Sequence, residues 1–145
     1  MKSKILITSI IILVVVFVLV AFSARKSPQI TIAGNTWVVE LADTEDKQTL
    51  GLSSRASLVE KTGLLFTFPR LDKQYFWMKD MLFPIDMIFL DDKWKIVLIE
   101  SNVGPETFPT TFGGQILAKY VLEVNAGEAK KADLKVGDTA VFQIN

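Results

Sequence analysis

The sequence contains neither cysteine nor histidine, and these two absences exclude several kinds of chemistry. A Ser-His-Asp or Cys-His nucleophile requires a histidine, and thioredoxin-like redox chemistry requires a reactive thiol. Protein zinc and copper sites are built mostly from histidine and cysteine ligands. Without cysteine the chain also lacks the thiol that bacterial lipoproteins use for lipid attachment. Oxygen-only calcium or magnesium sites stay open on composition, but Asp91-Asp92 lacks the spaced ligands of a calcium loop and is interpreted as a turn. We therefore expect no metal site and no cofactor, and any membrane anchor must be made of polypeptide.

An excess of positive charge is also missing. The chain has 16 basic and 16 acidic residues, and all of the acidic residues follow position 27. Four basic residues precede that position, which leaves 12 basic against 16 acidic residues and a net charge of −4 for the remainder. Domains that bind nucleic acid normally carry clustered Lys and Arg side chains that neutralise phosphates. We therefore expect no nucleic-acid partner.

Residues 5–22 carry no charge at all, and their only polar members are Thr8 and Ser9. A helix of this length rises about 27 Å, close to the thickness of the hydrocarbon core of a bilayer. The run predicts one transmembrane anchor in the lipid bilayer, with the N-terminus inside and the domain on the extracytoplasmic side. The alternative is a cleaved signal peptide with small residues at positions 21 and 23, which would make the domain secreted or periplasmic. We favour the retained anchor, because signal peptides usually have a shorter hydrophobic run of about 7 to 15 residues.

The remaining length allows one compact domain. The predicted organisation is a short tail over residues 1–4, the anchor over residues 5–22, a linker over residues 23–29 and a β-rich domain over residues 30–145.

Turn residues divide this domain into short apolar or alternating runs, which are typical of strands. Residues 30–32 and 37–41 flank Gly34-Asn35 and predict a hairpin. Asp43 or Thr44 can cap a helix that runs through Ser53. Further strands are predicted over residues 64–68, 75–79, 85–90, 94–99, 120–125 and 139–144, with a turn at 91–93 and a long loop at 101–114. The pattern predicts a mainly β (α+β) fold, a small barrel-like or sandwich-like sheet with one or two short helices.

Residues 75–90 include 12 apolar residues in 16 and raise the alternative of a second membrane span. Lys79, Asp80 and Asp86 would each cost about 2.5 to 3.5 kcal/mol near the centre of a bilayer, and Pro84 would interrupt the helix. A buried β-hairpin with its turn near residues 80–84 is therefore favoured.

Several motifs occur in an order that resembles the DUF192 family. They are Gly51-Leu52 with Arg55, Gly63-Leu64-Leu65-Phe66, Phe76-Trp77-Met78-Lys79, Pro84-Ile85-Asp86, Ile88-Phe89, residues 121–127 and Gly137-Asp138. The resemblance covers about residues 30–144. It implies a compact β-rich domain, often exported or tethered to a membrane, whose biochemical activity is unknown.

Two positions depart from the family pattern. Ser53 stands where the family usually has Met, and Asp80-Met81 replaces the common Asn-Thr after the Phe-Trp-Met-Lys motif. If that Asn-Thr pair belongs to a binding site, the specificity of this member differs from that of its relatives.

Asp86 interrupts an apolar strand, and the two-residue period places it on the face that carries Ile88 and Leu90. A carboxylate in that position needs a partner. In a functional interpretation, Asp86 and Lys79 pair across the hairpin at the floor of a ligand pocket, joined by Arg55. In a structural interpretation, which we favour, the pair only fixes the register of the hairpin.

Glu123 and Asn125 share one face of their predicted strand. Asp86 and Glu123 could supply the two carboxylates of a glycan hydrolase, which needs no histidine. We favour a simpler interpretation, in which Asn125 turns the chain and Glu123 is solvated or paired with a basic residue.

Alternation sends Tyr75, Trp77 and Lys79 to one face and Phe76 and Met78 to the other. The aromatic residues Tyr75, Phe76, Trp77, Phe83 and Phe89 either belong to the core or form a platform for a sugar or another flat ligand. Only half of them can line one pocket, and Trp77 with Lys79 is the candidate half.

The leading hypothesis is a non-enzymatic, extracytoplasmic binding or accessory module for a small envelope-derived ligand or a partner protein. Its candidate ligand-binding residues are Arg55, Trp77, Lys79, Asp86, Glu123 and Asn125. The first alternative is a carboxylate-dependent glycan hydrolase that uses Asp86 and Glu123 as catalytic residues. The second is a structural interaction domain, which predicts an exposed apolar patch and no pocket.

Overall fold

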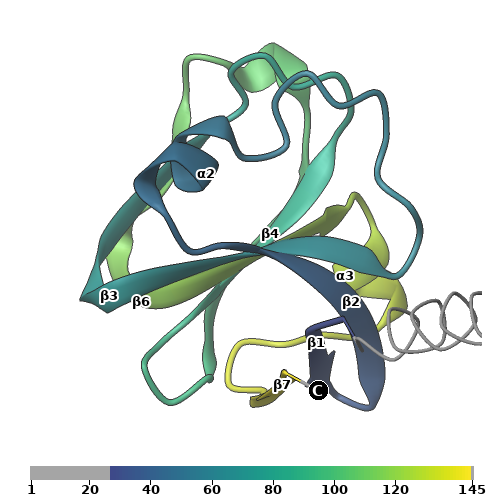
Figure 1. The fold of residues 1–145 in the computed structure, drawn as a ribbon, viewed down its shortest axis with the longest axis vertical. Helices are drawn as coiled ribbons and strands as arrows, with labels where there is room; N and C mark the ends of the chain where they lie inside the picture. Colours follow the sequence, from purple (N-terminus) through teal and green to yellow (C-terminus); the bar gives the residue numbers. More distant parts are fainter. Residues whose placement is uncertain (1–26, 145) are drawn as a thin grey trace, which may run out of the picture.

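Two long strands form the centre of the structure, a computed structural model that describes residues 27–144. β3 (Thr62–Trp77) and β6 (Thr111–Asn125) pair antiparallel from Gly63 opposite Val124 to Trp77 opposite Thr111 (Figure 1). The pairing shifts register between Thr67 and Asp72 and again between Lys73 and Tyr75. Such irregularities bend and twist a strand pair, and here they let the sheet curl.

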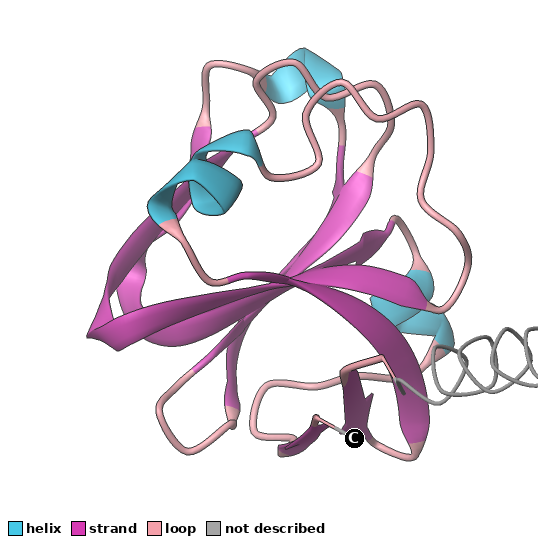
Figure 2. Cartoon of the chain, in the orientation of Figure 1, coloured by secondary structure: helices cyan, strands magenta, loops and turns pink. Residues whose placement is uncertain are grey.

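The other strands extend the sheet on both sides of this pair. β1 (Gln29–Ile32), β2 (Asn35–Ala42) and β7 (Ala140–Gln143) lie on the β3 side, whereas β4 (Ile85–Leu90) and β5 (Ile96–Val103) lie on the β6 side. The sheet order is β5-β4-β6-β3-β2-β1-β7, and every pair is antiparallel except β2 with β3. A bridge between Lys95 and Thr139 brings the two ends together. The result is a mixed sheet curled into a half-barrel (Figure 2).

Three short helical segments fill the connections. α2 (Glu45–Leu50) belongs to the crossover between the parallel strands β2 and β3. The 3-10 helix η1 (Pro105–Thr107) joins β5 to β6, and α3 (Glu128–Lys131) follows β6. Figure 1 shows α2 and α3 on opposite sides of the central strands.

The central strands bury apolar side chains on both faces. One cluster, on the face of α3, includes Trp37, Leu65, Ile88 and Leu122. The other includes Phe66, Phe76, Met87 and Phe89 and lies on the face of α2. Because side chains alternate along a strand, a shift of one residue moves a side chain from one cluster to the other.

Much of the predicted local structure is confirmed. β1 and β2 form the predicted hairpin, with Ile30 opposite Trp37. Thr44 caps α2 by accepting a hydrogen bond from the backbone N–H of Lys47 at 3.4 Å, although the helix ends at Leu50 and not at Ser53. β4 has the predicted bounds and turns at residues 91–93 into β5.

The predicted hairpin over residues 75–90 is wrong. β3 and β4 do not pair, because β6 lies between them in the sheet. The predicted strands 64–68 and 75–79 are also two parts of one strand, β3, which continues through the polar residues after Pro69. The edges of β3 are therefore taken by β2 and β6, which leaves none for β4.

The predicted loop over residues 101–114 is mostly strand. β5 continues to Val103 and β6 begins at Thr111, so only a short connection with η1 remains. Proline and glycine made this segment look irregular, but Gly113 and Gly114 are both within β6.

Among residues 27–144, no helix is both long and apolar enough to cross a membrane. The predicted anchor over residues 5–22 lies outside the described residues, as do the tail and part of the linker.

Asp86 connects β4 to two distant segments. Its carboxylate accepts the backbone N–H of Asn102 at 2.8 Å with one oxygen and that of Ala129 at 2.9 Å with the other. The side chain is completely buried on the face of α3. Asp86 therefore attaches the end of β5 and the start of α3 to the sheet.

We predict that Asp86→Ala destabilises the domain by about 2 to 6 kcal/mol, because two buried N–H groups each lose an acceptor at a cost of about 1 to 3 kcal/mol. Asp86→Asn keeps one acceptor oxygen and should lose less. Urea denaturation of the full-length protein measures both. The exposed turn residue Asp92 gives the control, and its change to Ala should fall within about 0.5 kcal/mol of wild type. Equal losses at the two positions would contradict the assigned role.

Candidate functional site

The structure places Asp86 and Glu123 on opposite faces of the sheet. β4 pairs with β6 so that Asp86 lies opposite Val124, and Met87 lies opposite Glu123. Paired residues share a face, so Glu123 is on the face of α2 with Met87, whereas Asp86 is on the face of α3. The catalytic pair required for the glycan hydrolase does not form, because a one-residue offset separates the two carboxylates across the sheet.

The expected Lys79–Asp86 pair does not form either. Both carboxylate oxygens of Asp86 accept backbone N–H groups, and Lys79 is an exposed residue beyond the end of β3. Within the described residues, neither side chain takes part in an ion pair. The favoured interpretation, in which this pair fixes the register of a hairpin, is therefore wrong as well, because β6 separates β3 from β4 and the carboxylate holds backbone groups of Asn102 and Ala129.

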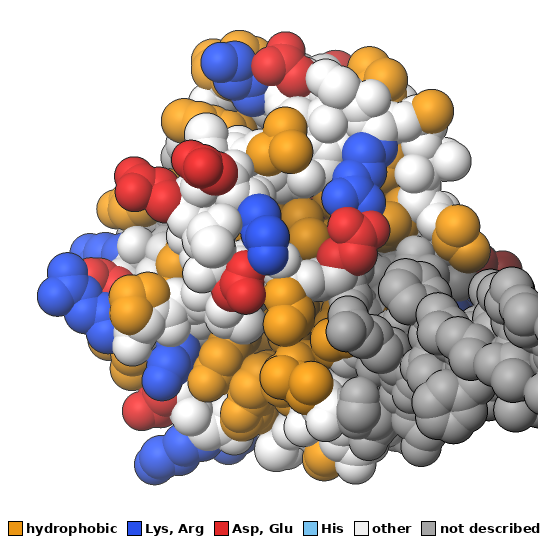
Figure 3. All heavy atoms as spheres, in the orientation of Figure 1, with side chains coloured by type: hydrophobic (Ala, Val, Ile, Leu, Met, Phe, Trp, Pro, Cys, Tyr) orange, Lys and Arg blue, Asp and Glu red, His pale blue; other side chains and the backbone are white. Residues whose placement is uncertain are grey.

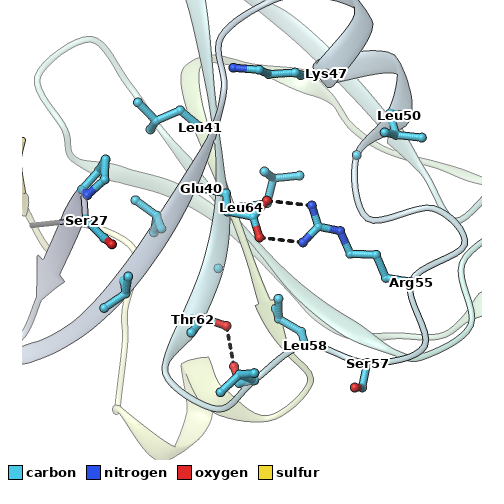
Figure 4. A pocket seen from close by; sticks show the side chains of 16 residues that line it. Ser27, Glu40, Leu41, Lys47, Leu50, Arg55, Ser57, Leu58, Thr62 and Leu64 are labelled. Atoms are coloured by element: carbon cyan, nitrogen blue, oxygen red, sulfur yellow. Dashed lines mark hydrogen bonds and ion pairs between the residues drawn. The ribbon is translucent and has the colours of Figure 1, made fainter. Parts of the chain in front are cut away.

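Arg55 is paired with Glu40 of β2, a residue that the sequence analysis did not single out. The guanidinium donates two hydrogen bonds to the carboxylate, at 2.7 and 2.8 Å (Figure 4). This contact holds the pKa of Glu40 below its usual value and raises that of Arg55. The alternation of side chains along β2 could have indicated Glu40 from the sequence. Glu40 is a charged residue between Val39 and Leu41, and it lies on the opposite face of the strand from both.

Asn125, at the end of β6, holds the segment that precedes β3. Its amide donates to the carbonyl of Leu58 at 3.0 Å and to that of Val59 at 3.4 Å. The chain turns immediately afterwards at Ala126-Gly127, as expected. Asn125 thus has a structural role at the edge of the site.

Glu123 is the most unusual group in the structure. Its side chain is only 5% exposed, and within residues 27–144 no group donates a hydrogen bond to its Oε2 atom. Desolvation by burial raises its pKa to about 8, although the positive charge of Arg55 acts in the opposite direction. Because this value is above neutral pH, the carboxyl group is mostly protonated under ordinary conditions and can donate a hydrogen bond. Such perturbed groups gather at functional sites.

A cavity of about 250 Å³ opens above Glu123, between α2 and β3. Aromatic rings supply much of its wall, and Phe66 meets Phe76 edge to face with centroids 4.8 Å apart. Trp77, 55% exposed, and Tyr75, 63% exposed, lie at the rim. The complete lining is Glu45, Gln48, Thr49, Gly51, Phe66, Phe68, Gln74, Tyr75, Phe76, Trp77 and Glu123. We call this space the aromatic cavity.

α2 is held over the aromatic cavity by Gln48. The side-chain amide of Gln48 donates to the carbonyl of Ala42 at 3.2 Å and to that of Thr67 at 3.0 Å. Gly51 ends the helix with a φ of 54°, a conformation that glycine adopts without strain. Sequence reasoning found the helix but missed Glu45 and Gln48 as lining residues. Their three-residue spacing, which puts them on one helix face, was the only available signal.

A second hollow of about 480 Å³ adjoins the aromatic cavity and shares Glu45, Thr49 and Trp77 with it. Lys79 lines this hollow together with Trp77, so the predicted Trp77–Lys79 pair is brought together on one surface. Ser53 donates its hydroxyl hydrogen to the carbonyl of Lys79 at 3.0 Å and so connects the end of α2 to this edge.

A third and larger space of about 670 Å³ surrounds the Arg55–Glu40 pair (Figure 4). It is bordered mainly by β2 and the start of β3, with Leu58 and Leu64 on its walls. Because each oxygen of Glu40 already accepts a guanidinium hydrogen bond, the charges here are satisfied within the protein. Figure 3 shows basic and acidic side chains lying next to each other on this side of the molecule, with hydrophobic side chains among them.

We predict that the stability of the protein falls as pH rises from about 4.5 to about 8, because the folded state keeps the Glu123 proton after the unfolded state has lost it. This one group contributes a slope of about 1.4 kcal/mol per pH unit. Glu123→Gln has no such proton, so the variant should gain stability over wild type as pH rises through this window. Urea denaturation at several pH values measures the difference. A constant difference between the two proteins would contradict the raised pKa.

Comparisons with known proteins agree with this fold and leave its activity open. A protein of unknown function from Novosphingobium aromaticivorans has a solved structure that is 29% identical, with a TM-score of 0.73 over 78% of this chain and 83% of that chain. A protein from Sinorhizobium meliloti, proposed to be a transcription regulator, is 28% identical, with a TM-score of 0.75 over 81% of this chain and 95% of that chain. A comparison with curated proteins gives no match.

The family comparison covers nearly all of the described structure. Residues 28–142 match the family DUF192, whose description is "Uncharacterized ACR". The match includes every strand of the half-barrel except the last residue of β7. This chain therefore belongs to the DUF192 family, whose function is uncharacterised.

Proposed function

We propose that this protein is a small-ligand-binding module of the cell envelope and that its ligand occupies the aromatic cavity. The observation that carries the proposal is Glu123, a buried carboxyl group at the base of that cavity whose Oε2 atom has no hydrogen-bond partner among residues 27–144. An unsatisfied buried polar group costs about 1 to 3 kcal/mol. A ligand that hydrogen-bonds Glu123 would recover this free energy, and this recovery gives the site its affinity.

The lining supports binding of a small molecule in particular. Ligand sites are typically concave and mostly apolar, with a few polar groups that fix the orientation of the ligand. The aromatic cavity has this composition, with rings of Phe66, Phe76 and Trp77 around the buried carboxyl group of Glu123. The alternative of a purely structural interaction domain predicted no pocket, so this cavity favours the binding module over it.

The candidate residues fall into two groups, those near the ligand and those that support the sheet. Trp77 and Glu123 line the aromatic cavity and would contact the ligand, while Lys79 lies in the adjoining hollow. Arg55 would act on the ligand only through its charge, because its hydrogen bonds go to Glu40. Asp86 and Asn125 would support the frame through their backbone contacts and would not touch the ligand.

The proposed location follows from the uncharged run of residues 5–22, which is long enough to span a bilayer. With the N-terminus inside, the domain would face the extracytoplasmic side, where it could bind a ligand derived from the envelope.

We expect protease added to intact bacterial spheroplasts to digest the domain of the full-length protein while a tag at the N-terminus remains protected. A retained hydrophobic anchor would keep the uncleaved protein in the membrane fraction after carbonate washing. A cytoplasmic protein of the same cells controls for lysis. A domain that resists the protease until the spheroplasts are lysed would contradict the proposed topology.

We expect a thermal-shift screen of the full-length protein against sugars, amino acids, nucleotides and amines to identify a ligand. A compound at about 100 times its Kd adds about 2.7 kcal/mol of stability. The same compound should change the fluorescence of Trp77, because Trp37 is buried and Trp94 is stacked on Tyr120.

Trp77→Ala should remove both the thermal shift and the fluorescence change while the protein remains folded, since this side chain is half exposed. Leu117→Ala is the matched control, because Leu117 is 50% exposed and lies on β6 outside the lining of the aromatic cavity. A shift that survives Trp77→Ala but disappears in Leu117→Ala would place the ligand elsewhere and contradict the proposed site.

A further inference from the structure

We propose that the aromatic cavity binds an organic cation, a ligand that carries an ammonium group. This inference rests on the proposed ligand-binding function and specifies the chemistry of its ligand. The observation behind it is the sign of the charges: the ionisable carboxyl groups of Glu45 and Glu123 line the cavity, and no Lys or Arg side chain is among its lining residues in the described chain.

The aromatic rings favour the same class of ligand. The face of an aromatic ring attracts a cation, by about 0.5 to 1 kcal/mol at exposed sites and more where water is excluded. Trp77, the most effective ring type for this contact, lies at the rim, and the rings of Phe66, Phe68 and Phe76 pack together behind it. Rings on the walls and a carboxyl group at the base match an ammonium group with apolar substituents.

The charged residues that line the adjoining hollow are also mostly acidic. Its lining includes Glu45, Asp46 and Asp80 against one basic residue, Lys79. A cation approaching along Trp77 would therefore meet an excess of negative charge before it reached Glu123. An anionic ligand would meet the same charges, and above the raised pKa of Glu123 it would also lie beside a negatively charged carboxylate.

The charged groups near Glu123 come from several elements and leave it available for a ligand. Arg55 acts on Glu123 through its charge, but its hydrogen bonds go to Glu40 of β2. Glu45 of α2 and Tyr75 of β3 face the same cavity. Met87, which lies opposite Glu123 on β4, has no ionisable group. A bound cation would thus be the direct partner that the carboxylate lacks.

Binding of a cation is then linked to ionisation of Glu123. The protonated carboxyl group gives no ion pair, so a permanent cation binds best after the proton has left. Because the pKa of Glu123 is raised to about 8, affinity should increase with pH by up to about tenfold per unit below that value and level off above it.

The test compares choline with 3,3-dimethylbutan-1-ol, a neutral compound of the same shape. Both are titrated against the full-length protein in dodecyl maltoside, which contains no ammonium group, and Trp77 fluorescence is followed at several pH values from 6 to 9. We expect choline to bind at least about tenfold more tightly than the neutral compound at pH 9, since about 1.4 kcal/mol of ion pairing corresponds to that ratio. The preference should shrink toward pH 6.

Two acid-to-amide variants separate the base of the cavity from its rim. Glu123→Gln should remove the pH dependence and weaken choline binding at pH 9 at least about tenfold. Glu45→Gln, at an exposed position on α2, should weaken binding less and keep the pH dependence. Far-ultraviolet circular dichroism confirms that both variants are folded.

Three results would overturn the inference. Equal binding of the neutral compound would show a ligand site that does not select a cation, and the proposed ligand-binding function would stand. A choline affinity that is unchanged in Glu123→Gln would place the cation elsewhere. If neither compound binds, the cation inference fails, and the thermal-shift screen with the other compound classes decides separately whether the ligand-binding proposal fails too.

Discussion

The antiparallel pairing of β3 with β6 is the constraint from which the rest of the structure follows. These strands cross closely where Gly63 lies opposite Val124, and a Cβ atom on Gly63 would come within 2.8 Å of the Glu123 carbonyl oxygen. Glycine therefore permits the close approach that fixes the register. Once the register is fixed, alternation determines which side chains of β6 enter each apolar cluster, and it sends Glu123 to the face that α2 covers.

A buried carboxyl group without a hydrogen-bond partner lowers the stability of the fold. A ligand that binds this group would recover the lost free energy, and this connects the fold to the proposed function. Burial removes water from Glu123, and Arg55, whose charge acts on Glu123, donates its hydrogen bonds to Glu40. The other two fully or nearly buried acids differ, because Asp86 accepts two backbone N–H groups and Glu128 accepts hydrogen bonds from Trp37 and Lys61. Glu123 is thus the acid that the described part of the chain leaves for an external partner, and the acidic, aromatic lining indicates a cation.

The sequence predicted the local features of the domain and missed the pairing between distant strands. Alternation correctly separated exposed Trp77 from buried Phe76, and it placed Asp86 on the face of Ile88. Whether Asp86 and Glu123 share a face depends on the β4–β6 register, which is set by tertiary contacts and not by either strand alone. The same applies to β6 lying between β3 and β4. Consequently the individual candidate residues could be found from the sequence. The cavity, and which of these residues line it, could not.

The central claim is that Glu123 remains protonated in the folded protein at neutral pH. The most direct measurement is an NMR titration of the Glu123 side-chain carboxyl carbon in the full-length protein, with its resonance assigned by its loss in Glu123→Gln. We expect a single transition at about pH 8, because burial raises the pKa of this group. A transition near the ordinary glutamate value of about 4.3 would show a solvated or paired carboxylate and would contradict the protonated state of Glu123.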